Sequence, residues 1–195
     1  MKLFGLTGGI GMGKSTAAEI LGQRGIPFVD TDAIAREVVA PGQPALVEVQ
    51  RLFGPEIVGA DGRLRRDELA RRVFADDDAR RKLEAVLHPA IRKIWLAQTE
   101  SWRAEGKPVG VVVIPLLFET NAASHFDATI CVACSGATQR KRLLARGLSD
   151  GQTDQRIKAQ LAIEEKMLRA DYVVWTEGSA EVHAEQLARI IPPRG

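Results

Sequence analysis

Residues 8–15 read Gly-Gly-Ile-Gly-Met-Gly-Lys-Ser and fit the pattern Gly-x-x-x-x-Gly-Lys-Ser/Thr without a mismatch. The apolar run 3–6 precedes them, and residues 16–21 are typical of the start of a helix. Between a strand and a helix, this pattern predicts a phosphate-binding loop, because its glycines let successive N–H groups point inward and the helix N-terminus adds partial positive charge. A merely flexible glycine turn is the weaker alternative. We therefore expect the chain to bind a nucleoside triphosphate.

Two side chains of this loop carry the expected chemistry. Lys14 is predicted to reach the β- and γ-phosphates, and the hydroxyl of Ser15 is predicted to coordinate Mg²⁺ as the metal cofactor of ATP. The loop residues expected to bind ATP are Gly9, Ile10, Gly11, Met12, Gly13, Lys14, Ser15 and Thr16.

Five short apolar runs predict strands, at residues 2–7, 26–30, 109–114, 128–134 and 171–175. Several of them are nearly continuous in Val, Ile and Leu, which is the pattern of parallel strands buried on both faces. Helical stretches separate the runs, as right-handed crossovers require. The sequence therefore predicts an α/β fold, a three-layer sandwich of the P-loop NTPase type around a five-stranded parallel sheet.

Composition and charge exclude several classes of partner. Because 27 basic and 25 acidic residues leave a formal net charge of +2, nucleic acid is not expected as the main partner. The longest apolar run, 109–118, is interrupted by Gly110 and Pro115 and is too short to span a bilayer. Cys131 and Cys134 lack further ligands at zinc spacing and are predicted to be buried thiols. We expect a cytoplasmic protein with no membrane contact and no obligate protein partner.

Carboxylates follow the second predicted strand, at the sheet edge where the glycine loop also lies. A phosphoryl transfer needs a group that orients the acceptor hydroxyl or accepts its proton, and an Asp at a strand end can do so. Asp and Thr are also good helix N-caps, so capping stays open for Asp30 and Thr31, whereas a functional role is favoured for Asp32. Arg36, one turn further on, is a candidate for substrate phosphate or a solvated surface arginine.

Arginines gather between the fourth and fifth predicted strands, at positions 140, 142 and 146. Arg142 and Arg146 are four residues apart and would share one face of a helix. An arginine-rich segment that closes over the phosphates can stabilise the charge of the transferring group and exclude water. An ordinary basic helix surface is the alternative, and a lid is the favoured interpretation.

The end of the third predicted strand lacks the acidic residue that many P-loop proteins use to hold Mg²⁺, because Ile114 occupies that position. The metal must then rely on Ser15, the phosphates and water, with Asp32 as a further candidate. Glu119 is a more distant candidate ligand or an exposed carboxylate. His88, followed by Pro89, would by itself indicate only a helix break.

Taken as a set, these segments resemble the dephospho-coenzyme A kinases. The match runs nearly the whole length of the chain, through residues 5–11, 29–32, 87–89, 115–119, 139–146, 156–160 and 170–174. The resemblance implies a phosphotransferase that moves the γ-phosphate of ATP to the ribose 3′-hydroxyl of dephospho-coenzyme A, the last step of coenzyme A synthesis. Its small-molecule partners would be ATP and dephospho-coenzyme A.

The resemblance also implies roles for individual positions. Its catalytic residues would be Asp32, Lys14 and Arg146, with Arg142 and the backbone near Gly178 beside the nucleotide. The acceptor would contact Asp32, Arg36, His88 and Leu117. We interpret residues 1–195 as a single domain with a core at 1–32, 106–136 and 170–195, a helical acceptor-binding insert at 33–105, and a lid at 137–169.

Two positions depart from the family pattern. Thr31 replaces an Ala between the two aspartates, and Trp175-Thr176 stands where the family commonly has Asp-Asn, so the resemblance does not extend to adenine contacts at that corner. Another small-molecule P-loop kinase, such as a nucleoside monophosphate kinase, is the nearest alternative. A regulatory GTPase is disfavoured because the chain has no Asn-Lys-x-Asp motif, and a nucleic-acid-binding ATPase is disfavoured by the charge balance.

Overall fold

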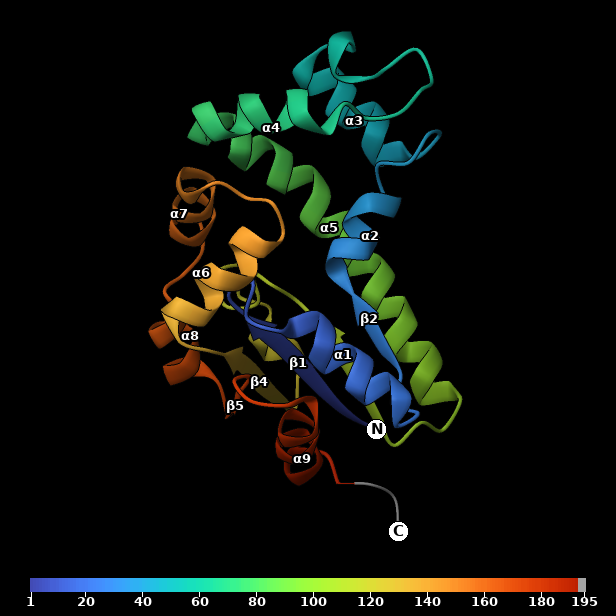
Figure 1. The fold of residues 1–195 in the computed structure, drawn as a ribbon. Coiled ribbons are helices and arrows are strands. Elements are labelled where there is room, and N and C mark those ends of the chain that lie inside the picture. The colour runs from blue at the N-terminus through green and yellow to red at the C-terminus, as the bar shows by residue number, and fades with distance from the viewer. Residues whose placement is uncertain (193–195) are drawn as a thin grey trace. The chain divides into compact units, whose positions relative to one another are not determined.

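The computed structural model describes residues 1–192, without the side chains of residues 74 and 75 (Figure 1). The chain forms two compact units, one built from residues 1–30 and from residue 101 onward, the other from residues 31–100. Each unit has an apolar core of its own.

The first unit contains a single parallel sheet in the strand order β2-β3-β1-β4-β5. The strands are β1 (Lys2–Gly8), β2 (Phe28–Asp30), β3 (Val109–Val113), β4 (Ala128–Ala133) and β5 (Tyr172–Trp175). The five-stranded parallel sheet expected from the sequence is therefore confirmed. Because β1 is the central strand, the loop that follows it begins in the middle of the carboxyl edge, where α/β sheets bind their ligands.

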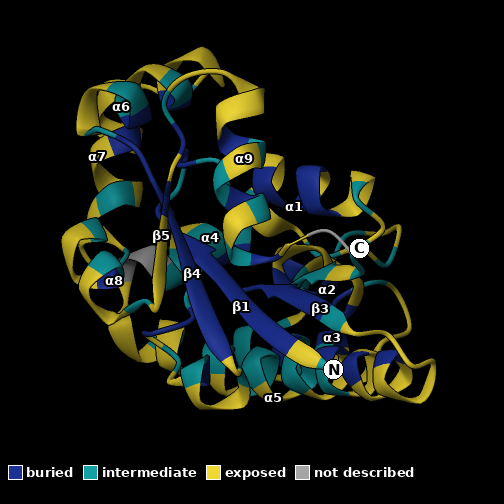
Figure 2. Cartoon of the chain, turned by 90° about the horizontal axis from the view of Figure 1, so that it is seen from below, coloured by how far each residue is buried: buried dark blue, intermediate teal, exposed yellow. Residues whose placement is uncertain are grey.

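The core of the first unit lies along β1 and β4, which are buried almost throughout (Figure 2). On one face Phe4 and Ile130 pack with Leu21 of α1 (Lys14–Gln23) and Leu187 of α9 (Ala180–Ile190). The other helices of this unit are α6 (Gly136–Ala145), α7 (Asp150–Lys158), α8 (Ile163–Arg169) and the short η2 (Ala122–His125). Helix α8 contacts β1 and β4 on the side away from α1, which completes a three-layer arrangement (Figure 2).

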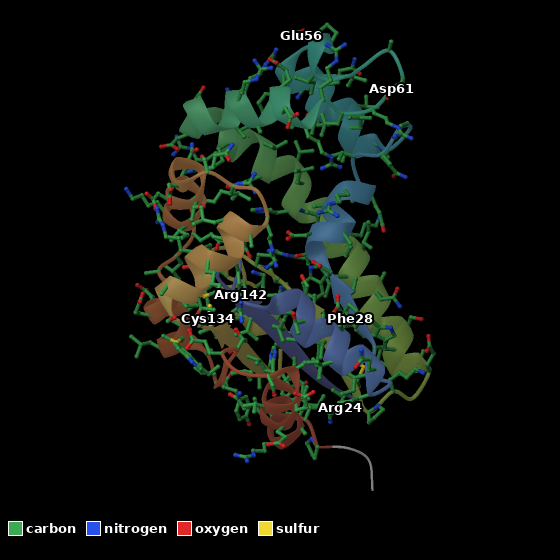
Figure 3. All side chains as sticks on the ribbon, viewed as in Figure 1. Arg24, Phe28, Glu56, Asp61, Cys134 and Arg142 are labelled. Atoms are coloured by element: carbon green, nitrogen blue, oxygen red, sulfur yellow. The ribbon has the colours of Figure 1, made fainter. Side chains whose placement is uncertain are left out.

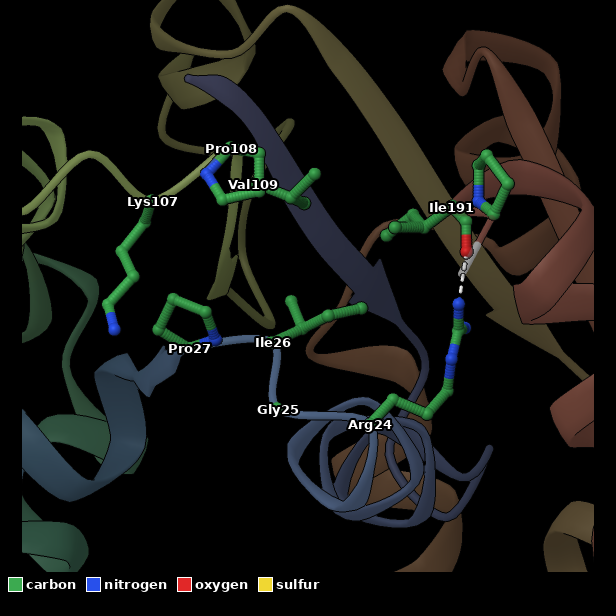
Figure 4. Close-up of a pocket in the computed structure, with 9 residues that line it drawn as sticks. Arg24, Gly25, Ile26, Pro27, Lys107, Pro108, Val109 and Ile191 are labelled. Atoms are coloured by element: carbon green, nitrogen blue, oxygen red, sulfur yellow. Dashed lines mark hydrogen bonds between the residues drawn. The ribbon is translucent and has the colours of Figure 1, made fainter. Parts of the chain in front are cut away.

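A pocket of about 500 Å³ opens at the opposite, amino-terminal edge of this sheet (Figure 4). Its walls include Pro27 and Val109, which lie where β2 and β3 begin. In it, Arg24 donates a hydrogen bond from Nη2 to the carbonyl of Ile191 and so ties the end of α1 to the end of α9. The pocket therefore lies away from the glycine loop.

The second unit is helical. It comprises α2 (Thr31–Glu37), α3 (Pro44–Phe53), η1 (Pro55–Ile57), α4 (Arg66–Ala75) and the part of α5 (Asp77–Ala104) up to residue 100. Buried Val49, Ile57 and Leu69 form its core, with Leu83 and Leu87 of α5 packed against them. Within the described part of the chain, no helix has both the length and the apolar character needed to cross a membrane.

Helix α5 continues without interruption through Pro89. The break that His88-Pro89 would by itself indicate does not occur in this chain. A proline inside a helix costs ~3 kcal/mol, because it removes one main-chain donor and crowds the preceding turn. Apolar packing offsets this cost, since Leu83 and Leu87 anchor the helix before the proline and Trp95, 2% exposed, is buried after it.

Candidate active site

The glycine loop joins the end of β1 to the first turn of α1. Gly8 has φ of +151°, and a Cβ there would lie 2.3 Å from the carbonyl oxygen of Val132, so no other residue fits. Gly13 is the N-cap of α1 in the left-handed conformation, with φ of +96°. Lys14 begins the helix and donates hydrogen bonds from Nζ to the carbonyls of Gly8 at 2.8 Å and Gly9 at 3.0 Å. The loop is therefore folded with its lysine drawn across it.

Two glutamines hold the middle of this loop. The amide N–H of Ile10 donates to Oε1 of Gln160 at 2.8 Å, and the carbonyl of Ile10 accepts from Nε2 of Gln139 at 2.8 Å. Gln139 lies on α6 and Gln160 lies between α7 and α8, so the segment expected to be a lid contributes directly to the loop's shape. The main-chain groups of Ile10 are occupied within the protein in this structure.

Arg142, which is labelled in Figure 3, and Thr176 connect the loop to the end of β5. Arg142 donates from Nη2 to the carbonyl of Thr176 at 2.6 Å and from Nη1 to its hydroxyl at 3.0 Å. The Thr176 hydroxyl in turn donates to the carbonyl of Met12 at 3.0 Å. The departure from the family pattern at position 176 thus has a structural use, because this buried threonine bonds both the loop and the arginine.

The segment that follows Thr176 is fixed by Glu177. Its Oε1 accepts hydrogen bonds from the amide of Ser135, at 2.9 Å, and from the Ser135 hydroxyl. These bonds, with further ones from Thr138 and Trp175, lower the pKa of Glu177 from 4.5 to about 2. Ser135 is the N-cap of α6, so Glu177 joins the start of α6 to the turn that contains Gly178, whose φ is +99°.

The three arginines expected in the lid have different environments. Arg140 forms ion pairs with Asp150 and Asp154 at 2.7 and 2.6 Å and so ties α6 to α7. Arg146 is the exposed C-cap residue of α6, and within residues 1–192 its side chain has no hydrogen-bond or ion-pair partner. Of the three arginines, Arg146 is therefore the one whose guanidinium binds no other group among residues 1–192.

An ion pair between a buried lysine and a partly exposed glutamate connects α8 to the segment after β3. Lys166 has a side chain that is 0% exposed, and its Nζ lies 2.7 Å from Oε1 of Glu119. The same ammonium donates to the carbonyl of Pro115 at 2.7 Å, and Glu119 Oε1 also accepts from the amide of Leu161 at 3.0 Å. Glu119 is thus used to bind a lysine, and a ligand role toward a metal is disfavoured.

In the first unit, the candidate protein ligand for Mg²⁺ is the hydroxyl of Ser15 and not a group of carboxylates. Ser15 is exposed in the first turn of α1, and Ile114 directly follows β3. Among the residues that the structure describes, no group of three or more His, Cys, Asp or Glu side chains is placed to hold a metal. Mg²⁺ usually keeps several waters and binds through few protein groups together with phosphates. The residues therefore fit an ion that is held largely by a triphosphate.

The other predicted acceptor residues belong to the second unit. Asp32 and Arg36 are exposed and lie four residues apart on α2, which follows β2 without a connecting residue. His88 lies half-buried on α5, and burial lowers its pKa. Asp32 and Arg36 thus share a helix face, while His88 is positioned by a different helix.

Leu117, also expected to bind the acceptor, is 0% exposed. It packs on β1, since a Cβ added at Gly5 would lie 2.5 Å from its Cδ1. This burial does not favour a substrate contact through the Leu117 side chain. Cys131 and Cys134 are free, buried thiols, as the sequence predicts, and burial raises the pKa of Cys131 to about 11.

Sequence reasoning missed Lys166, and it noted Gln139, Gln160 and Thr176 only as positions that match or depart from the family pattern, without a contact for any of them. A signal existed for Lys166. It lies three residues after Ile163 and one before Met167, and this spacing places it on the same buried face of α8 as those two apolar residues. A lysine on an apolar face predicts a buried partner. The two glutamines and the threonine gave no such signal, since their partners are main-chain atoms more than a hundred residues away.

Comparison with known proteins gives a consistent result. A sequence profile of the family described as dephospho-CoA kinase matches residues 2–181. A dephospho-CoA kinase of Anaeromyxobacter dehalogenans is 45% identical over 192 residues, which are 98% of this chain and 91% of that protein. A crystal structure from Thermus thermophilus has a TM-score of 0.86 and 36% identity and covers 97% of this chain and 95% of its own. The dephospho-CoA kinase from Campylobacter jejuni has a TM-score of 0.72 at 28% identity, with coverage of 98% and 96%. The chain therefore belongs to the dephospho-CoA kinase family.

Proposed function

We propose that this protein transfers the γ-phosphate of ATP to the ribose 3′-hydroxyl of dephospho-coenzyme A, which yields coenzyme A and ADP. Membership of the family over nearly the whole chain supports the reaction. The observation that carries the proposal is the folded glycine loop at the carboxyl end of the central strand, with Lys14 drawn across it. This is the arrangement that binds the donor's phosphates in P-loop kinases.

On the donor side, the exposed first turn of α1 supplies main-chain N–H groups and a positive helix end to the β- and γ-phosphates. Lys14 would exchange its bonds to Gly8 and Gly9 for phosphate oxygens. Ser15 would hold Mg²⁺, which, when bound, neutralises charge on the phosphates. Ile10, Gly11 and Met12 would contribute by shaping the loop. Gln139 and Gln160 already bind the main chain of Ile10, Thr176 binds the carbonyl of Met12, and Arg142 donates to the carbonyl of Gly11 at 3.5 Å.

On the acceptor side, we assign Asp32 to the 3′-hydroxyl, which it would orient in line with the γ-phosphate and whose proton it would accept. Asp32→Asn keeps the size of the side chain but removes the negative charge. We expect turnover to fall by roughly 10²–10⁴-fold with ATP affinity unchanged. A near-normal turnover in a variant that still binds ATP would exclude this role.

The helical insert 33–105 would bind the acceptor, and the segment 137–169 would act as the lid. Within the lid, Arg146 has an exposed guanidinium without a described partner, which supports its assignment to the transferring phosphate. Arg142 is bound to Thr176 and lies beside the loop, which supports a position near the nucleotide and a role in holding the site together. The free cysteines agree with a cytoplasmic location, which we also propose.

The reaction is tested by incubating the protein with ATP and Mg²⁺ and, separately, with dephospho-coenzyme A, AMP, CMP or shikimate. Phosphorylation of dephospho-coenzyme A alone, with the new phosphate at the 3′-position by ³¹P NMR, is the expected result. Phosphorylation of another acceptor instead would leave a P-loop kinase of different specificity.

A further inference from the structure

The second unit contains a pocket of about 340 Å³ that is lined by three arginines. Arg36 lies in the last turn of α2, Arg63 lies just before α4, and Arg66 is the first residue of α4. Apolar atoms of Val39, Pro41 and Leu64 form the rest of the wall together with Ala40. No carboxylate lines the pocket, so its lining combines three arginines with apolar residues.

The charges of these arginines are poorly compensated within the protein. Among residues 1–192, neither Arg36 nor Arg66 forms an ion pair, and Arg66 donates only to the carbonyl of Arg36 at 3.5 Å. The side-chain Nε of Arg63 lies 4.0 Å from Oδ2 of Asp61, with both side chains largely exposed, and the main-chain N–H of Arg63 donates to Oδ1 of Asp61 at 3.1 Å. By contrast, Arg71 and Arg72 on the same helix pair with Glu68 at 2.5 and 3.1 Å. With Asp61 as the one carboxylate that contacts any of them among the described residues, at 4.0 Å from Arg63, the three guanidinium groups repel one another, and an anion between them would relieve that repulsion.

The backbone around the pocket is held in place. Val58 and Leu64 form an antiparallel bridge, and Gly59 donates to the carbonyl of Arg63 at 2.8 Å across the turn between them. Arg65, the N-cap of α4, makes no side-chain capping bond, so the first N–H groups of this ten-residue helix lack a side-chain acceptor at the cap. Asp67 and Glu68 lie in the first turn of α4 but do not line the pocket.

The position of Arg36 on α2 relates the pocket to the acceptor hydroxyl. Asp32 and Arg36 are separated by one helical turn, about 6 Å along the axis. A ribose 3′-oxygen and the 5′-phosphate of the same nucleotide are separated by a span of the same order. An acceptor that presents its 3′-hydroxyl to Asp32 would therefore bring its 5′-diphosphate to Arg36.

We propose that Arg36, Arg63 and Arg66 form the subsite for the diphosphate of the acceptor, a dianion linked to an uncharged arm that lies on Val39, Pro41 and Leu64. This proposal rests on the proposed function, and it adds Arg63 and Arg66 to the acceptor site. Planar guanidinium groups bind phosphate oxygens in pairs of parallel hydrogen bonds, which lysines in the same places could not do.

Binding of dephospho-coenzyme A to the full-length protein by calorimetry tests the subsite. Arg63→Ala and Arg66→Ala should each weaken binding by about tenfold or more, since each removes charge-assisted hydrogen bonds. Affinity for ATP should not change. Arg51→Ala is the matched control, because it removes an exposed arginine of the same unit that pairs with Glu48 and does not line the pocket.

Chemical modification gives an independent measurement that does not depend on folded variants. Phenylglyoxal modifies accessible arginines, and peptide mass spectrometry reports each site. Dephospho-coenzyme A should protect Arg63 and Arg66 but not Arg51, and ATP alone should protect neither. Unchanged affinity in both variants, or no protection, would overturn the subsite even if the wild-type protein phosphorylates dephospho-coenzyme A. A wild-type protein inactive on dephospho-coenzyme A would instead overturn the proposed function.

Discussion

The buried pair of Lys166 and Glu119 makes an asymmetric prediction about stability. Lys166 is fully buried, whereas the side chain of Glu119 is 22% exposed. Lys166→Met leaves a carboxylate that water can still reach and that keeps its bond from the Leu161 amide. Glu119→Gln leaves an ammonium with no access to water and with the Pro115 carbonyl and a neutral amide as partners. Leaving a buried charge unpaired costs about 3–5 kcal/mol, so we place Glu119→Gln in this range and Lys166→Met below it, because the carboxylate that remains is already in contact with water.

Urea denaturation followed by circular dichroism measures these free energies of unfolding. The double variant should be more stable than Glu119→Gln alone, because it no longer buries an unpaired charge. Arg169→Met is the control, since Arg169 pairs with Glu165 on the surface of the same helix and should cost less than about 1 kcal/mol. A smaller loss of unfolding free energy for Glu119→Gln than for Lys166→Met would refute the reasoning. Losses in both variants no greater than the loss in Arg169→Met would refute it as well.

Arg142→Ala should lower the midpoint of thermal unfolding, since it removes two bonds to Thr176. Arg146→Ala should instead leave the midpoint unchanged and lower turnover. If Arg146→Ala lowered the midpoint and Arg142→Ala lowered only turnover, the roles of the two arginines would be exchanged. Glu177 stays charged in the folded protein down to pH about 2 but takes up a proton near pH 4.5 when unfolded, so its contribution to stability is present above pH 4.5 and is lost as the pH falls toward 2. In Glu177→Gln, acid titration of the unfolding free energy should show a shallower fall across this window, and an unchanged slope would contradict the hydrogen bonds assigned to Glu177.

Periodicity and spacing predicted the fold closely, because each strand and helix has its pattern in consecutive residues. Short apolar runs marked all five strands, and the glycine pattern marked the loop. Pro89 by itself favours a break, yet apolar packing on either side of it keeps α5 continuous. The same limit applies to the candidate site. Arg140 and Arg142 look alike in the sequence, yet one binds Asp150 and the other Thr176, and only the folded chain distinguishes them.

The raised pKa of Cys131 has a consequence for an enzyme whose substrate and product both end in a thiol. Disulfide exchange requires a thiolate that can reach a sulfur atom. Both cysteines are buried, and burial raises the pKa of each, to about 11 for Cys131, so neither offers a thiolate at neutral pH. Burial of both thiols therefore disfavours mixed disulfides between this chain and oxidised coenzyme A.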